Sequence, residues 1–461
     1  MLLNHCRLYA PLSGGFAGED CCVELDGGKI TAVGPARPDT AEAFDCGGQT
    51  LLPGLIDLHT HITFLRNVGV AQAHDPMQLV VEAAAQADRY LRHGFTTIRD
   101  CGSIRRSANY VRQLIDRGLM AGPDILACGQ TLMPSVTAST GVGDITHYCD
   151  GAEEFRKAVR EEVAAQADFI KIYASGSAFS PTGVPKHPIM TFDEIKTAVD
   201  TARANGIYVA AHCHADSAIR DCVQAGVRTI EHATYLSEAT TDLLLASEDS
   251  YLVPTLAAMY VSQTDPQERS FWLSRLTPML EDCAKAIGYA YRTGALIGFG
   301  TDSAPMSPQY DTGVEFRFRR EYCGMENMDI LLQATKNSAQ IAGLSDVGEI
   351  KPGMKADLIL VDGDPVAELS AMARACVRRA AAGVLLHLWG HSLQPDLVRH
   401  DDMALLLRHS GAGLRQRTDG RGAEYAVLPH RRAVLCRFGI SALDDGLLLA
   451  QHLSGQPHLL V

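Results

Sequence analysis

Three features are missing from this sequence, and each absence excludes a class of protein. No apolar stretch reaches membrane-spanning length, and the opening MLLNHCRLYAPLSGG has neither the basic start nor the long apolar middle of a secretory signal. The 13 cysteines include no CxxC spacing and form no disulfide-like pattern. We therefore expect free thiols, a cytoplasmic location and no membrane partner.

The sequence also lacks an excess of basic charge. Its formal net charge is -13 over 461 residues, whereas surfaces that bind phosphates need clustered lysine and arginine. A nucleic-acid partner is therefore not expected. Hydrophobic residues make up 46% and charged residues 21%, which is typical of globular proteins. The length fits one large α/β domain with a smaller companion, and a homo-oligomer stays open.

The centre of the chain alternates short β-rich runs with helix-like stretches, which is the pattern of parallel βα units. Two of these stretches, 75–94 and 191–206, have helical periodicity and close on a glycine. The runs number eight: 54–62, 96–102, 124–129, 169–175, 207–213, 229–234, 251–256 and 296–303. The sequence therefore predicts a (β/α)8 TIM barrel, in which chemistry occurs at the C-terminal ends of the strands.

Residue types that bind metals fall at the ends of these runs. GLIDLHTHITF (54–64) places His59 and His61 two residues apart, and side chains two apart in a strand share a face. Both imidazoles can therefore reach one metal ion. An isolated H-x-H is more often incidental, but here four further residues occupy matching places on other runs: Lys171, His212, His232 and Asp302.

Lys171 lies between Ile170 and Ile172 in the run FIKIYAS (169–175). A buried, unpaired ammonium costs several kcal/mol, so the amine is expected to be neutral or compensated. A neutral amine can react with carbon dioxide to give a carbamate, N6-carboxylysine, whose two oxygens can bridge two metals. The alternative is a lysine that reaches solvent or pairs with an acid. The ligand types on the other runs favour the carbamate.

PGLIDLHTH, the lysine of run four, the histidines of runs five and six, and GTDS of run eight resemble the metal-dependent amidohydrolase superfamily in its binuclear form. FTTIRDCG, GVRTIEHATYL and IGFGTDS are most similar to its branch of Xaa-Pro dipeptidases and imidazolonepropionases. The resemblance covers residues 1–370. It implies a barrel over 54–345 and a small β-sandwich built from 1–53 and 346–373.

The resemblance also implies a ligand set and a mechanism. The first metal would be held by His59, His61 and Asp302, the second by His212 and His232, and carboxylated Lys171 would bridge them. Two divalent ions are expected, with zinc favoured over manganese, cobalt or iron. A hydroxide bridging the metals would attack the amide of a dipeptide or N-acyl amino acid. Asp302 would take its proton and pass it to the leaving nitrogen.

Further residues are candidates for contact with the substrate. His214 is similar in position to a substrate-contacting residue of the dipeptidases, although a polar loop residue is the alternative. Tyr173 and Tyr235 would line the pocket or simply pack. Many relatives carry a Gly-Gly-His after strand three whose histidine polarises the carbonyl. This chain lacks that motif, and His147 is the nearest histidine to take over its catalytic role.

Two other function classes stay open. The first is a mononuclear cyclic-amide hydrolase of the imidazolonepropionase type, with an ordinary Lys171. The second is a non-catalytic barrel homologue, suggested by the missing Gly-Gly-His. The residues three positions after His212 and His214 are Ala215 and Ser217 rather than glutamate, which counts against deamination. Arginines of segment 304–322 could pair with a substrate carboxylate or form a solvated helix face: Arg317, Arg319 and Arg320.

Residues 374–461 differ in composition from the rest of the chain. They contain no lysine and no asparagine, and we recognise no strand pair there that would complete the sandwich. Seven histidines are scattered in this segment without metal-ligand spacing: His387, His391, His400, His409, His430, His452 and His458. The change predicts an atypical tail, either frame-shifted near residue 373 or poorly ordered, with a genuine extra domain as the alternative.

Overall fold

The structure is a computed structural model of the whole chain. It describes residues 1–40, 43–63, 76–135, 145–178, 185–259, 266–303, 313–373, 378–379 and 385–388. All of these residues belong to one compact unit, Met1–Ser410. Most of the predicted tail therefore lies outside the described residues.

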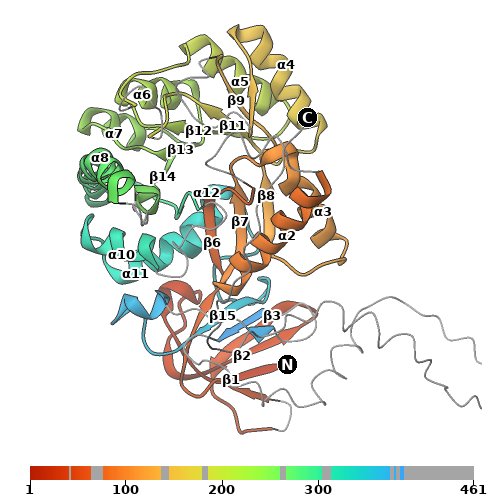
Figure 1. The fold of residues 1–461 in the computed structure, drawn as a ribbon. Helices are drawn as coiled ribbons and strands as arrows, with labels where there is room; N and C mark the ends of the chain where they lie inside the picture. Colours follow the sequence, from red (N-terminus) through yellow and green to blue (C-terminus); the bar gives the residue numbers. More distant parts are fainter. Residues whose placement is uncertain are drawn as a thin grey trace, which may run out of the picture. The chain divides into compact units, whose positions relative to one another are not determined.

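Two parallel sheets carry the centre of the chain (Figure 1). One has the order β6-β7-β8 and the other the order β10-β9-β11-β12-β13-β14. Their strands are β6 (Leu55–Thr60), β7 (Phe95–Asp100), β8 (Asp124–Ala127), β9 (Thr131–Met133), β10 (Thr146–Tyr148), β11 (Ile170–Tyr173), β12 (Val209–Cys213), β13 (Thr229–His232) and β14 (Tyr251–Val253). Seven of the eight predicted runs thus contain a strand, and β9 and β10 are additions.

The eighth run, 296–303, forms no regular strand. It makes two isolated parallel bridges instead, Leu252↔Ile297 to β14 and Thr60↔Ser303 to β6. Backbone bonds support both contacts, because Gly298 N donates to Leu252 O and Leu58 N donates to Phe299 O. The run therefore lies between the last strand of one sheet and the first strand of the other.

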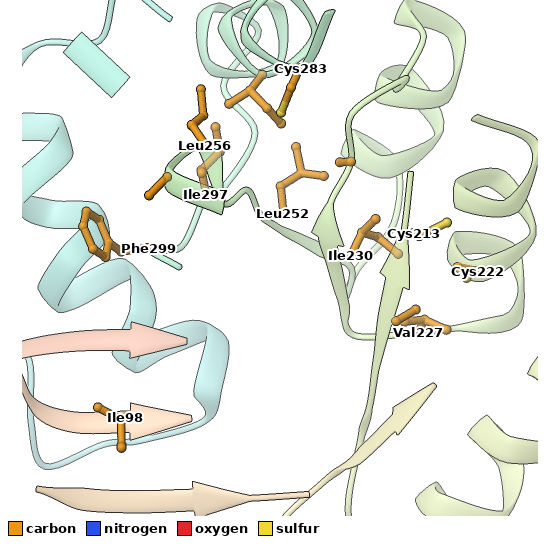
Figure 2. Close-up of a cluster of buried hydrophobic side chains, with 14 of the residues drawn as sticks. Ile98, Cys213, Cys222, Val227, Ile230, Leu252, Leu256, Cys283, Ile297 and Phe299 are labelled. Atoms are coloured by element: carbon orange, nitrogen blue, oxygen red, sulfur yellow. The ribbon is translucent and has the colours of Figure 1, made fainter. Parts of the chain in front are cut away.

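The central strands are buried on both faces, as is typical of parallel sheets covered by helices. Every residue of β6, β7, β11, β12 and β13 is buried. Figure 2 shows part of the resulting core, where Ile230 of β13 and Leu252 of β14 lie near Cys222 and Cys283 from covering helices. A polar side chain in these strands must therefore have a buried partner.

Helices follow the central strands, and two of them match the predicted stretches. α2 spans Pro76–Arg92 and α5 spans Phe192–Ala204. α5 begins with a capping box, in which the Thr191 side chain accepts from Glu194 N and the Glu194 carboxylate accepts from Thr191 N. The other helices are α3 (Ser107–Asp116), α4 (Gly151–Ala164), α6 (Asp216–Ala225), α7 (Glu238–Leu245), α8 (Pro266–Arg292), α10 (Val314–Glu321), α11 (Asn327–Leu332) and α12 (Ser338–Ala342). None of the described helices is both long and apolar enough to cross a membrane.

A third sheet joins the N-terminal segment to the residues after the helices. Its order is β16-β17-β15-β5-β1-β2-β3, with β4 beside β1. The strands are β1 (Leu2–Leu8), β2 (Gly18–Asp26), β3 (Lys29–Pro35), β4 (Ala43–Asp45), β5 (Thr50–Pro53), β15 (Asp357–Val361), β16 (Arg378–Arg379) and β17 (Leu385–Leu388). β17 pairs in parallel with β15. Two short strands after residue 373, where no strand pair was recognised from the sequence, therefore belong to this sheet.

Candidate metal centre

Histidines from separate strands converge at the C-terminal ends of the parallel sheets. The ring centroids of His59 and His232 lie 4.8 Å apart, and those of His212 and His232 lie 4.5 Å apart. His61 lies 5.5 Å from His59 by the same measure. Together they surround a cavity of about 40 Å³, which is large enough for a few water-sized species. Its lining residues are His59, His61, Tyr173, Ser177, Ala178, His212, His214, His232, Ala258, Met259 and Asp302.

Asp302 faces His59 of β6 and His61, which follows this strand. Its Oδ1 lies 3.2 Å from His61 Nε2 and 3.5 Å from His59 Nε2. Burial alone would raise the pKa of Asp302, but the hydrogen bond from His61 and the nearby positive charges lower it to about 2. The carboxylate is therefore ionised at neutral pH. One oxygen of Asp302 thus lies close to both imidazoles, each of which can bind a cation.

Each of the four expected histidine ligands has one ring nitrogen held by a fixed partner. The pairs are His59 Nδ1 with Glu231 Oε2 (2.7 Å), His61 Nδ1 with Gly102 O (2.8 Å), His212 Nε2 with Gly176 O (3.1 Å) and His232 Nδ1 with Thr255 Oγ1 (2.6 Å). Such partners fix the ring orientation and direct the second nitrogen toward a metal. The site therefore offers Nε2 of His59, His61 and His232, and Nδ1 of His212.

Lys171 is completely buried beside these histidines. Its Nζ lies 3.3 Å from His59 Nε2 and 5.8 Å from the centre of the Tyr173 ring. Within the described part of the chain, no carboxylate oxygen lies within 4.0 Å of Nζ. The structure thus places the amine inside the site, without the solvent contact or acidic partner that the alternative requires.

Two residues of the site have an unusual backbone conformation. His232 has φ 68° and Asp302 has φ 53°, in the left-handed region that non-glycine residues rarely adopt. Each costs on the order of 1–3 kcal/mol and persists only where the surrounding structure fixes it. His232 is the last residue of β13 and Asp302 lies near the end of run 296–303, and both side chains line the cavity.

A set of buried charged residues that was not predicted from the sequence contacts the histidines from the side away from the cavity or supports their backbone. Glu231 bonds His59 through one oxygen and Arg99 through the other, and all three are buried. Asp57 accepts from the backbone nitrogens of His59 and Thr301. A signal was available, because an ionisable residue inside a strand buried on both faces needs a partner. The sequence could not say which partner.

The candidates for substrate contact divide into two groups. Tyr173 and His214 line the cavity. The Tyr173 ring stacks on His212 at 4.3 Å, and His214 Nδ1 lies 2.7 Å from Thr234 Oγ1. Burial lowers the pKa of His214 to about 3, so its ring is neutral.

Tyr235 and His147 are not brought to this cavity. The Tyr235 ring lies 4.8 Å from Lys186 Nζ. His147 Nδ1 lies 3.7 Å from a carboxylate oxygen of Glu161 on helix α4. Side chains alternate across a strand, and in β10 it is Thr146, next to His147, that bonds inward to Thr131. No contact in the described structure supports the catalytic role predicted for His147.

Of the three arginines considered for a substrate carboxylate, Arg319 is buried in a network of its own. It donates to Glu315 Oε1 (2.8 Å), to Pro254 O (2.9 Å) and to Gly298 O (3.0 Å). Glu315 in turn accepts from the backbone nitrogen of Ala257, next to the cavity-lining Ala258. Arg319 therefore supports the cavity wall instead of facing the substrate.

Arg319→Met is expected to lower the free energy of unfolding by about 3–5 kcal/mol, because it leaves Glu315 buried without its partner. Arg317→Met is the matched control, since the Arg317 side chain is 50% exposed and its ion pair with Glu321 is long, at 3.9 Å. That control should change stability by no more than about 0.5 kcal/mol. Urea denaturation measures both variants, and equal effects would contradict the buried network.

The donor set fits divalent metal ions. Ligand atoms of His59, His232 and Asp302 all lie within 4.8 Å of one another, as do those of His212, His214 and His232. Imidazole nitrogen and carboxylate oxygen are the donors that zinc and similar metals take in hydrolytic sites. These two groups share His232, and a third group among the described residues combines His59 with Cys101 and Glu231.

Comparison with known proteins identifies the family. Residues 50–381 match the model of the amidohydrolase family, which is more than half of the chain. The chain belongs to the amidohydrolase family. It is accordingly a hydrolase that acts on carbon–nitrogen bonds, as the motifs predicted.

The relatives of this amidohydrolase lie in the expected branch. A solved Xaa-Pro dipeptidase with methionine bound in its active site is 26% identical, with a TM-score of 0.72, and the match covers 84% of this chain and 99% of that one. Ochratoxinase of Aspergillus niger is 25% identical over 353 residues, 69% of this chain and 71% of the relative. Imidazolonepropionase of Rhodococcus jostii is 22% identical over 371 residues, 74% and 82% respectively. The branch predicted from the motifs is thereby confirmed.

Proposed function

We propose that this amidohydrolase is a binuclear metal enzyme that cleaves the amide bond of a small molecule, either a dipeptide or an N-acyl amino acid. The observation that carries the proposal is the buried Lys171, which lies 3.3 Å from His59 and has no acidic partner among the described residues. A carbamate formed on this amine would be close enough to the histidines to serve as the proposed bridging ligand. The similarity to a Xaa-Pro dipeptidase supports this substrate class.

The proposed architecture is a closed (β/α)8 barrel over 54–345 with a β-sandwich made by 1–53 and 346–373. The bridges of run 296–303 to β14 and to β6 support closure on one side. Asp168 N donates to Ala127 O, which supports contact between the two parallel sheets on the other side. The strand ends then form one ring, and the site lies at its centre.

The proposed division of ligands between two ions is the one that the resemblance to binuclear amidohydrolases implies. His59, His61 and Asp302 would hold one ion, and His212 and His232 the other, with zinc as the expected metal. Lys171 would bridge them as a carbamate, in which its nitrogen bonds the carbon of carbon dioxide and releases one proton. When bound, the ions would polarise the substrate carbonyl and lower the pKa of water to about 7.

Three side chains would transfer protons or orient the substrate. Asp302 is ionised, so it can accept a proton from the attacking water and deliver it to the leaving nitrogen. His214 is neutral, and its Nε2 can donate to a substrate carbonyl or carboxylate when the Thr234 hydroxyl donates to Nδ1. Tyr173 would pack against the substrate beside His212.

His214→Ala is expected to lower kcat/KM by about 10- to 100-fold, mainly through KM, because it removes a hydrogen bond worth about 1.5–3 kcal/mol to a charged substrate group. Tyr235→Phe is the control, since the cavity lining does not include Tyr235, and it should leave both constants unchanged. Steady-state kinetics on the best substrate measures kcat and KM separately. An unchanged KM in His214→Ala would remove this residue from substrate binding.

A library of dipeptides and N-acyl amino acids, scored for released amino acid with zinc-loaded protein, tests the substrate class. We expect turnover of a subset that shares one type of C-terminal residue. A flat result across metal-loaded protein would reject the amidase proposal. The similarity to imidazolonepropionase favours a mononuclear cyclic-amide hydrolase as the second candidate, which would instead require one metal and tolerate loss of the Lys171 amine.

A further inference from the structure

We propose that Glu231 and Arg99 form a positioning unit that orients His59 and sets the metal affinity of the site. The inference rests on the proposed metal centre but concerns residues outside its ligand set. Glu231 lies on β13 directly before His232, Arg99 lies on β7, and His59 lies on β6. Three strands thus contribute a series of contacts that runs from Arg99 through Glu231 to His59, a proposed metal ligand.

The two carboxylate oxygens of Glu231 bond different residues. Oε2 lies 2.7 Å from His59 Nδ1, and Oε1 lies 2.6 Å from Arg99 Nη2. The Thr229 hydroxyl also donates to Oε1, at 2.6 Å. With both oxygens bonded and the side chain fully buried, the carboxylate has one orientation. It therefore presents an acceptor to His59 at a fixed place.

Arg99 is held as firmly as the carboxylate that it fixes. Its Nε donates to Leu58 O (2.5 Å) and its Nη1 donates to Thr229 Oγ1 (3.0 Å), while the Phe169 ring centre lies 5.1 Å from the guanidinium carbon. Leu58 is the residue before His59. One planar guanidinium thus fixes the backbone next to His59 and the carboxylate against its ring, a double contact that suits arginine and not lysine.

The contact determines which nitrogen of His59 can bind a cation. An ionised carboxylate can only accept hydrogen bonds, so His59 Nδ1 must carry the hydrogen and Nε2 must present its lone pair. Nε2 is the atom that lies 3.3 Å from Lys171 Nζ and 3.5 Å from Asp302 Oδ1. A carboxylate behind a ligand histidine also makes that ligand a stronger base. Because Arg99 balances the charge of Glu231, the pair does this without adding net charge.

The test is zinc affinity of Glu231→Gln, measured by competition with a chromophoric chelator, together with the visible spectrum of the cobalt-substituted protein. Glutamine is neutral and can turn its NH2 toward His59, so we expect zinc to bind about 10- to 100-fold more weakly and the cobalt bands to shift. Glu162→Gln is the matched control. Glu162 is equally buried and bonds Arg106 instead of a histidine, so neither readout should change.

The outcomes separate this inference from the proposed function. Wild-type affinity and an unshifted cobalt spectrum in Glu231→Gln would overturn the positioning role while leaving the metal centre intact. If the wild-type chain binds no metal, the proposed function fails first. Arg99→Lys provides a second variant should Glu231→Gln fail to fold, because it keeps the charge but cannot contact Leu58 O and Glu231 together. It should weaken zinc binding in the same direction, and unchanged affinity would again overturn the role.

Discussion

Lys171→Ala is expected to reduce the bound metal from about two ions per chain to one or none, and to lower kcat/KM by about 1,000-fold or more, because a bridged pair of ions contributes several kcal/mol to transition-state stabilisation. The reason lies in the position of the amine, which is completely buried and 3.3 Å from His59 Nε2. Elemental analysis of protein purified with zinc and bicarbonate measures the metal. Initial rates on the best substrate measure the activity.

A control and a rescue distinguish a lost bridge from a damaged fold. Lys196→Ala removes a lysine whose side chain is 39% exposed and which pairs with Asp200 on the surface of α5, so it should change neither metal content nor rate. Propionate added to Lys171→Ala would supply two oxygens in the vacated space and is expected to restore part of the metal. A full metal load in Lys171→Ala without propionate would mean that the lysine is structural.

Asp302→Asn is expected to lower kcat by about 100- to 10,000-fold, which is the range that a positioned general base contributes. Asparagine has nearly the same shape but cannot take a proton, whereas Asp302 is ionised, with a pKa of about 2. Saturating zinc is needed in this assay, because Asp302 is also a proposed ligand. The metal content of each sample is counted alongside the rate.

The control for this variant is Asp242→Asn, an exposed carboxylate on helix α7, which should leave kcat unchanged. Retention of kcat within tenfold in metal-loaded Asp302→Asn would assign the proton transfer to another group. A fall in metal content that accounts for the whole loss of rate would leave Asp302 as a ligand only.

Much of the fold could be predicted from local pattern alone. Seven strands lie where short β-rich runs indicated them, and five of these strands are buried along their whole length, which leaves little choice of residue. The helices α2 and α5 begin and end within two residues of the predicted stretches. Run 296–303 was harder, since its pairing consists of two bridges to distant strands. Strands β16 and β17 are too short for their alternation to be recognised.

Some residues of the candidate site could also be predicted from local pattern, and others could not. His59, His61, His212 and His232 were predictable because strand period and strand ends determine where such side chains point. The positions of His147 and Tyr235 depend on the path of the connecting segments around the sheet. Strand or helix periodicity in the sequence does not predict that path. Glu231 takes its partners Arg99 and His59 from two other strands, so the sequence indicated that a partner was needed but not which residue it was. Arg319 bonds Glu315 on its own helix, but it also bonds Pro254 O and Gly298 O, which are distant in the sequence.

Metal counting on the wild-type chain tests the central claim most directly. Protein purified with zinc and bicarbonate, then freed of loosely bound metal and analysed for elements, is predicted to hold about two zinc ions per chain, as expected for two adjoining ligand groups bridged by one carbamate. One ion per chain would contradict the binuclear account and favour the mononuclear cyclic-amide hydrolase. No bound metal would contradict both and favour the non-catalytic homologue.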